Sequence, residues 1–298
     1  MRTTTNKPAE SGLVILDKPA GWTSHQVVGR VRRLLGTRKV GHAGTLDPMA
    51  TGVLVVGVNR ATRLLGLLAL DDKAYAATIR LGMATRTDDA DGEMLTAAGA
   101  ADLDPLQLDA TVAALTGDLQ QVPSAVSAIK VVGVRAYDRV RTGHEVALAP
   151  RAVRVSRFEV RERREARVDG IPVVDLDVVV ECSTGTYVRA LARDLGTALG
   201  TGGHLTALRR LRSGPFSLAE AQTLTEDPPT LLGLADAVRR CFRSLTVDDA
   251  TATAVRYGRR LTGVTLPAPR TALFAGSGEF LALYRQQPSE AVPEAVFV

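Results

Sequence analysis

Hydrophobic residues in the first part of the chain form short apolar runs separated by amphipathic segments. The run LVILDKP at 13–19 is typical of a buried strand that ends at its proline. A helix capped by Thr23 or Ser24 is predicted next. Its apolar face consists of Val27, Val28, Val31, Leu34 and Leu35. The Gly-rich stretch 39–52 predicts a loop, and the run VLVVGV after it predicts a second short strand.

The same mixture continues through the middle of the chain. A helix over about 61–70 leads to a strand at 73–81, where Tyr75, Ala77, Ile79 and Leu81 alternate toward one face. Further helices are predicted at 105–116, from YVRALARDLGTALG and after TEDPPT, with a buried strand at 171–181 and short β-like pieces beyond 246. Because strands and helices do not alternate regularly, we expect an α+β fold.

Charge changes this picture by pointing to a partner. The chain carries 37 basic and 32 acidic residues, a net charge of +5, and only five of the basic residues are lysines. The segment 124–168 alone holds eleven basic and five acidic residues, a net charge of +6. Arginine suits bidentate phosphate contacts and stacking on bases, although a GC-rich coding bias gives the same excess. Nucleic acid is therefore the favoured partner.

Cysteine and histidine usage excludes several classes of protein. Two cysteines cannot form a disulfide framework, and the four histidines are scattered without metal-ligand spacing, so we expect no metal site. The N-terminal residues lack the apolar core of a signal peptide, and the longest apolar runs are too short to cross a bilayer. We expect a cytoplasmic protein that binds no membrane.

The loop GHAGTLDPMATG at 41–52 is the strongest candidate for chemistry. Its three glycines leave room for a ligand, and Pro48 biases Asp47 toward an extended conformation that fixes the direction of the carboxylate. An Asx-turn is the alternative role for Asp47, and composition alone favours that turn. No complete phosphate-binding glycine motif accompanies the loop.

Four other motifs each have a functional and a structural interpretation. In DKAY (72–75), the tyrosine is either a stacking surface or a half-buried strand residue. In CSTGTYVRALARDLG (182–196), Tyr187 and Arg189 either receive an anion at a helix start or form a cap with a solvated arginine. HLTALRRLRSG (204–214) either holds phosphates or forms a solvated face. SAIK (127–130) matches a serine acyl hydrolase motif by chance, since its companion motifs are missing.

Taken together and in this order, the motifs resemble the TruB family of tRNA pseudouridine synthases. The resemblance rests on LDKPAGWTSHQVV, GHAGTLDPMATGVL, DKAY, TDDADGE, PSAVSAIKVVGVRAY and CSTGTYVRALARDLG, and it covers about 13–214. It implies a mixed, largely antiparallel sheet with flanking helices. It also implies isomerisation of the uridine at position 55, in the TΨC loop of tRNA, to pseudouridine without a cofactor.

The resemblance also implies a division of the chain and a monomer that needs no protein partner. A catalytic domain would span 1–245, with an RNA-binding insertion at about 124–150 that contains Lys130. The tail, 246–298, would be a small, mostly β, PUA-like RNA-binding module. An inactive RNA-binding scaffold and a guide-RNA-dependent synthase of the dyskerin type are the alternatives. The presence of Asp47 argues against the first, and the absence of long Lys-rich tails argues against the second.

The resemblance also implies a role for each of six individual residues. Asp47 matches the catalytic aspartate, and Arg189 matches the arginine that pairs with it. Tyr75 matches the aromatic residue that stacks on the target uracil. The remaining positions, which match residues around the flipped-out nucleotide, are His42, Tyr187 and Leu208. Whether the carboxylate attacks C1′ or C6, or assists a glycal route, stays open.

Overall fold

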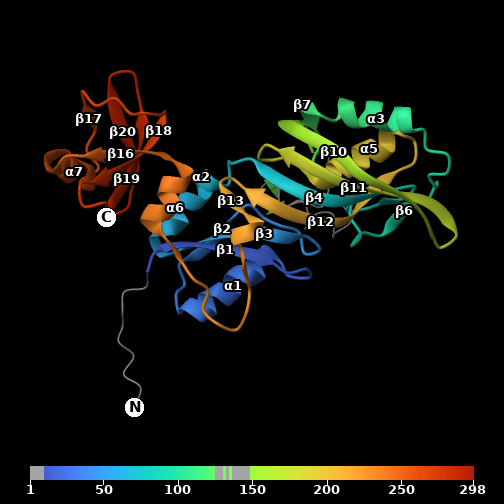
Figure 1. Cartoon of the computed structure of the whole chain (residues 1–298), viewed down its shortest axis with the longest axis horizontal. Coiled ribbons are helices and arrows are strands. Elements are labelled where there is room, and N and C mark those ends of the chain that lie inside the picture. Colours follow the sequence, from blue (N-terminus) through green and yellow to red (C-terminus); the bar gives the residue numbers. More distant parts are fainter. Residues whose placement is uncertain (1–9, 125–129, 132–133, 136–147) are drawn as a thin grey trace, which may run out of the picture.

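The computed structural model describes residues 10–124, 130–131, 134–135 and 148–298, and it contains two main sheets (Figure 1). The larger has eleven strands, in the order β14-β1-β3-β12-β4-β11-β10-β7, with β2, β13 and β15 paired at its side. Only the pairs β1·β14 and β3·β12 in it are parallel. With six α-helices in the described residues, the fold is α+β with a largely antiparallel sheet, as predicted.

One half of the large sheet is built from the N-terminal elements. They are β1 (Gly12–Lys18), α1 (Ser24–Leu35), β2 (Val40–Ala43), β3 (Thr51–Val58), the 3-10 helix η1 (Asn59–Leu64) and α2 (Leu65–Leu68). Thr23 caps α1 and forms a reciprocal capping box with Gln26. Two local predictions differ from the structure: the loop at 39–52 contains β2, and the helix expected at about 61–70 is divided between the end of the 3-10 helix η1 and the four-residue α2.

The other half of the sheet carries the main core. It comprises β4 (Lys73–Leu81), β10 (Arg151–Val168), β11 (Ile171–Cys182) and β12 (Gly203–Ser213). The predicted alternation in β4 is confirmed, since Tyr75, Ala77, Ile79 and Leu81 all enter one core cluster with residues of β11. Two helices, α3 (Pro105–Ala114) and α5 (Val188–Ala198), contribute buried residues to that cluster and cover this face of the sheet (Figure 1).

Short elements complete this region. They are β5 (Ala84–Thr85), β6 (Met94–Thr96), β7 (Gly117–Gln121), β8 (Lys130–Val131), β9 (Val134–Arg135), β13 (Phe216–Ser217), η2 (Leu218–Glu220), β14 (Gln222–Thr223), β15 (Leu232–Gly233) and α6 (Leu234–Cys241). The expected insertion at 124–150 lies almost entirely outside the described residues. Lys130 belongs to β8, but its side chain is not among those described.

The C-terminal residues form the second sheet, drawn in red at the left of Figure 1. Its elements are β16 (Arg243–Val247), α7 (Asp249–Arg256), β17 (Leu261–Thr262), β18 (Arg270–Ala275), β19 (Phe280–Gln286) and β20 (Glu290–Val296). Phe274 and Phe297 each contact the ring of Phe280 in a tilted arrangement, and all three join a core cluster with Leu64 of η1 and Leu68 of α2. The module therefore shares a hydrophobic core with the rest of the chain.

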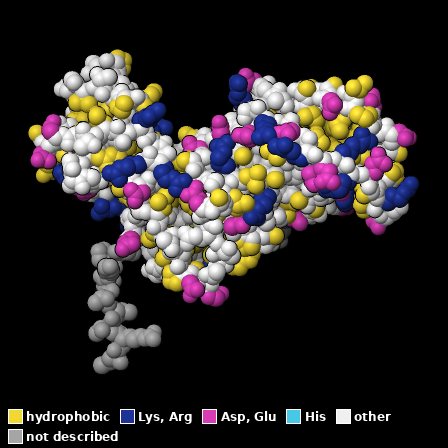
Figure 2. Space-filling model, viewed as in Figure 1, with side chains coloured by type: hydrophobic (Ala, Val, Ile, Leu, Met, Phe, Trp, Pro, Cys, Tyr) yellow, Lys and Arg dark blue, Asp and Glu magenta, His cyan; other side chains and the backbone are white. Residues whose placement is uncertain are grey.

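Most arginines of β10 are paired with carboxylates. Arg154 pairs with Asp118 of β7, Arg157 with Glu159 and Glu181, and Arg164 with Asp177 of β11. In Figure 2, basic and acidic side chains accordingly lie side by side over the large sheet. The described part of the basic segment thus has little unpaired charge. In the described residues, no helix is long and apolar enough to cross a membrane.

The two half-sheets meet at a narrow seam where β3 and β12 pair only through Arg209–Arg210 and Thr51–Gly52. Gly52 has φ of 100°, and a Cβ at this position would overlap the carbonyl oxygen of Arg210. Glycine is required here both for its backbone conformation and for the close approach of the two strands.

We expect Gly52→Ala to lower the free energy of unfolding by about 2–4 kcal/mol, because it adds backbone strain and overpacks the seam. Urea denaturation measures the change. Gly29→Ala is the matched control: it lies in α1 with open space around its Cβ, so it should raise stability by about 0.5–1 kcal/mol. Equal stabilities for Gly52→Ala and the natural protein would contradict the steric argument.

Candidate functional site

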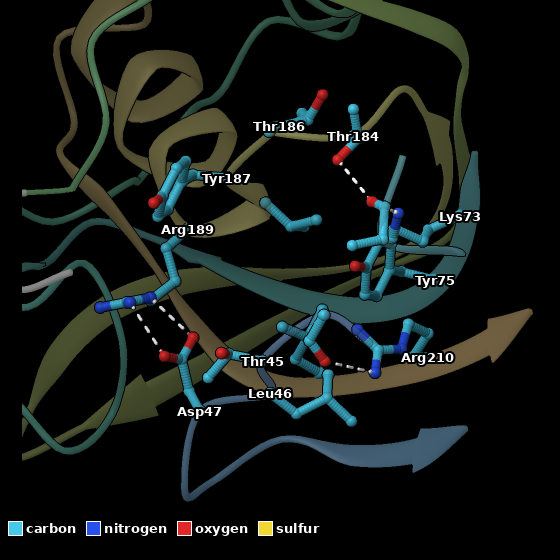
Figure 3. A pocket seen from close by; sticks show the side chains of 15 residues that line it. Thr45, Leu46, Asp47, Lys73, Tyr75, Thr184, Thr186, Tyr187, Arg189 and Arg210 are labelled. Atoms are coloured by element: carbon cyan, nitrogen blue, oxygen red, sulfur yellow. Dashed lines mark hydrogen bonds and ion pairs between the residues drawn. The ribbon is translucent and has the colours of Figure 1, made fainter. Parts of the chain in front are cut away.

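A cavity of about 280 Å³ opens where the two half-sheets and the start of α5 meet. Loop 44–47 forms one side, β4 and β12 form the floor, and residues 184–189 form the opposite rim. Five of the seven predicted site residues line it: Asp47, Tyr75, Tyr187, Arg189 and Leu208. Figure 3 shows Asp47 and Arg189 on one side of the cavity and Lys73, Tyr75 and Arg210 on the other.

Asp47 is held by a two-pronged ion pair. Arg189 Nε lies 3.0 Å from Asp47 Oδ2, and Nη2 donates to Oδ1 over 3.0 Å. The Arg189 side chain is only 6% exposed, whereas that of Asp47 is 33% exposed. This geometry fixes the direction of the carboxylate and leaves it accessible from the cavity. Arg189 is therefore no solvated helix cap.

Hydrogen bonds from Lys18, the last residue of β1, and from Ser24, the first residue of α1, hold the backbone of the Asp47 loop. Lys18 is buried, and its ammonium donates to the carbonyls of Pro19, Trp22 and Pro48. The Ser24 hydroxyl accepts from the Leu46 amide and donates to the Leu46 carbonyl. Burial lowers the pKa of Lys18 to about 8, although the charge of Asp47 opposes this shift. The residues on both sides of Asp47 are thus fixed by hydrogen bonds.

Arg189 also binds a second carboxylate that the sequence analysis missed. Its Nη1 lies 3.3 Å from Asp89 Oδ2 and donates to the Thr87 carbonyl over 2.9 Å. Asp89 belongs to TDDADGE, a motif that contributed to the family resemblance but from which no site residue was predicted. Its side chain is as buried as that of Arg189. One guanidinium therefore serves two carboxylates, and the Lys18 ammonium is a second cation whose charge acts on Asp47.

Burial and the pairing act in opposite directions on Asp47. Burial raises the pKa of Asp47 above its ordinary value, the charge of Arg189 lowers it, and the charge of Asp89 raises it again. The balance is a raised pKa. An arginine beside a carboxylate favours the anion, but burial outweighs the charge of Arg189 here.

The opposite side of the cavity is aromatic and cationic. Tyr75 of β4 is 8% exposed, and burial raises the pKa of its hydroxyl. Leu208 of β12 is buried in the same core cluster. Tyr187 caps α5, where its amide donates to Gln121 Oε1 over 2.8 Å and its carbonyl accepts from Gln121 Nε2. Tyr75 and Leu208 line the cavity together with Lys73 and Arg210, whereas Tyr187 lies next to Arg189 (Figure 3).

Two cations of this wall were not assigned from the sequence. Arg210 was placed in a motif interpreted as phosphate-binding or solvated, but it is 1% exposed and donates to the carbonyls of Val53 and Gly44. Lys73 is also buried, and it donates to the carbonyls of Ala69 and Asp71. Neither interpretation of that arginine motif holds for Arg210.

His42 is the described site residue that does not line the cavity. It lies in β2 opposite Val56, half-buried, and in the described structure its Nδ1 is buried without a hydrogen-bond partner. Burial lowers the pKa of His42, and the charges of Arg210 and His25 lower it further. A metal site has no support in the described ranges, which hold no group of three His, Cys, Asp or Glu side chains suited to a metal ion.

Comparisons with known proteins identify the family of the chain. Residues 32–188 match the family described as "TruB family pseudouridylate synthase (N terminal domain)". Residues 189–227 match "tRNA pseudouridylate synthase B C-terminal domain", and 242–298 match "tRNA Pseudouridine synthase II, C terminal". The three matches together span most of the chain.

Two curated relatives are named tRNA pseudouridine synthase B. That of Nocardia farcinica is 59% identical over 96% of this chain and 92% of its own length, and that of Cutibacterium acnes is 58% identical over 93% of both chains. Among solved structures, a chain of "Crystal Structure of a Cbf5-Nop10-Gar1 Complex" has a TM-score of 0.69 at 26% identity, covering 96% of this chain and 85% of that one. The chain belongs to the TruB family of pseudouridylate synthases.

Proposed function

We propose that this pseudouridine synthase acts on tRNA and isomerises the uridine at position 55, in the TΨC loop. The observation that carries the proposal is the Asp47 carboxylate, fixed by Arg189 and facing Tyr75 across a cavity. The identity of nearly 60% with curated tRNA pseudouridine synthases supports tRNA as the substrate. The identity to the chain from a Cbf5-Nop10-Gar1 complex is much lower, at 26%, which supports an enzyme that needs no protein partner.

The target base must leave its stack to reach this cavity, which costs a few kcal/mol. Stacking of the uracil on the ring of Tyr75 offsets that cost by about 1–3 kcal/mol. Tyr187 and Leu208 close the space around the base. His42, which lies outside the cavity lining, is then placed to contact the RNA beside the extruded nucleotide. Segment 124–150, with Lys130, supplies phosphate contacts.

The glycosidic bond from N1 to C1′ then breaks, the uracil turns, and C5 bonds to C1′. Asp47 assists by attack at C1′, by attack at C6, or by taking a proton on the glycal route. Each route requires the carboxylate in its ionised form. The bidentate contact with Arg189 holds the carboxylate in one orientation, so no reorganisation is needed as the reaction begins.

Asp47→Asn tests the assignment directly. The amide keeps the shape of the side chain but removes the charge and the nucleophile, so pseudouridine formation should become undetectable. Affinity for tRNA should change by less than about tenfold, or about 1.4 kcal/mol. Single-turnover release of tritium from [5-³H]uridine tRNA, together with filter binding, measures the two quantities.

Asp194→Asn is the control, since Asp194 lies in α5 and pairs with Arg193 outside the cavity. It should retain the activity of the natural enzyme. Release at the natural rate by Asp47→Asn would refute the catalytic role, and parallel loss of binding would make the role of Asp47 structural.

The raised pKa of Asp47 predicts a specific pH dependence. Activity should fall on the acidic side with a midpoint above the ordinary aspartate value of 3.8, because protonation removes the reactive anion. Replacing Arg189 by Met removes the charge that lowers the pKa of Asp47, so the midpoint should move to higher pH. Single-turnover rates between about pH 4 and pH 8 measure it.

Arg193→Met serves as the control for this pH series, because Arg193 pairs with Asp88 and Asp194 and not with Asp47. Its acidic midpoint should equal that of the natural enzyme. A midpoint that stays in place after Arg189→Met would show that the acidic limb belongs to another group.

Salt dependence tests the role of the basic segment. Replacing Arg135, Arg139 and Arg141 by Gln should flatten the log–log dependence of tRNA affinity on salt by about 0.7–0.9 per lost phosphate contact. The same replacement of Arg154, Arg157 and Arg164, which pair with carboxylates, should have a smaller effect. Filter binding at several salt concentrations gives both slopes, and equal slopes for the two triple variants would contradict the assignment.

A further inference from the structure

Arg210 is a buried cation that makes no ion pair in the described part of the chain. Its Nε donates to the Val53 carbonyl over 2.6 Å, its Nη2 donates to the Gly44 carbonyl over 3.1 Å, and it also contacts the Tyr75 hydroxyl. These partners are neutral. Burying a charge without a counter-charge is costly, so such groups are found where the charge itself is used.

Lys73 places a second cation on the same wall. It is buried, its ammonium donates to the Ala69 carbonyl over 2.9 Å, and it lines the cavity together with Arg210. Burial lowers the pKa of Lys73, and the charge of Arg210 lowers it further. The two side chains lie on either side of Tyr75 in Figure 3. The wall beside the stacking surface is therefore electropositive.

The opposite wall carries the carboxylates of Asp47 and Asp89, which share Arg189. A uracil stacked on Tyr75 lies between the two walls, with its sugar toward Asp47. When the bond from N1 to C1′ breaks, its electron pair stays on the uracil and spreads over N1, O2 and O4. The pair returns when C5 bonds to C1′, after which C5 loses its proton and N1 gains one.

We propose that Arg210, with Lys73 beside it, stabilises the negative charge that develops on the uracil as its glycosidic bond breaks. The proposal rests on the function proposed above. Hydrogen bonds to Val53 and Gly44 fix the guanidinium in advance, so it does not have to move during the reaction. A preorganised charge in a water-poor site is an effective way to stabilise a transition state.

A better leaving group provides the test. Fluorine at C5 withdraws electrons and stabilises the uracil anion, so 5-fluorouridine depends less on help from the protein. We measure single-turnover loss of uridine or of 5-fluorouridine at the target position of a TΨC stem-loop RNA, in nuclease digests. Arg210→Met should lower the rate with uridine by about 10²–10³-fold. With 5-fluorouridine, the factor by which the same variant lowers the rate should be at least about tenfold smaller.

Two further variants keep the test decisive. Arg210→Lys retains the charge and should recover most of the rate. Lys73→Met should lower the single-turnover rate about tenfold with uridine and by a smaller factor with 5-fluorouridine. Because Lys73 lies outside the β3–β12 seam, this variant provides the comparison of the two substrates if Arg210→Met does not fold. Arg80→Met is the control, since Arg80 of β4 pairs with Asp175 outside this cavity and outside the seam, and it should keep the natural rate.

Equal losses on the two substrates would overturn the proposal and leave Arg210 as a brace between Gly44, Val53 and Tyr75. A loss confined to RNA affinity in filter binding would overturn it as well. Failure of the proposed function looks different, because the natural enzyme itself would then convert neither substrate.

Discussion

The ion pair between Asp47 and Arg189 is the interaction on which the site depends. A carboxylate enclosed this far is unfavourable unless a cation and hydrogen bonds compensate for lost water. The partner lies 142 residues away in sequence, at the start of α5, and reaches Asp47 only because β11 delivers the chain to the cavity rim. The large sheet therefore brings the loop that carries Asp47 next to the start of α5, which carries Arg189.

Rigid support on both sides of this pair explains why so much of the surrounding polar structure is buried. Lys18 and Ser24 fix the backbone of the Asp47 loop, while Asp89 and the Thr87 carbonyl fix the far side of Arg189. None of these contacts requires a substrate. Since the groups are held before binding, the enzyme avoids the cost of ordering them during the reaction.

Patterns that depend on neighbouring residues were predictable from the sequence. The alternation around Tyr75, the cap at Thr23 and the α+β class follow from local periodicity, and Asp47 follows from its loop and from family motifs. Asp89 and Arg210 were not predictable, because their roles depend on strands paired far along the chain. The arginine-rich motif did not distinguish Arg210, which is buried, from Arg209 and Arg212, which are half-buried.

The same long-range strand pairing determines on which side of the cavity each charged residue lies. The seam at Gly52 brings the backbone of β3 against that of β12 and so fixes Arg210 beside Tyr75. The loop after β2 places Asp47 on the other side of the cavity. A nucleotide between them meets negative charge at its sugar and positive charge at its base. When the glycosidic bond breaks, its electron pair moves from the sugar to the base, so this arrangement of charges matches the direction of that movement. The direction of the field is therefore set by strand topology as well as by the identity of the charged residues.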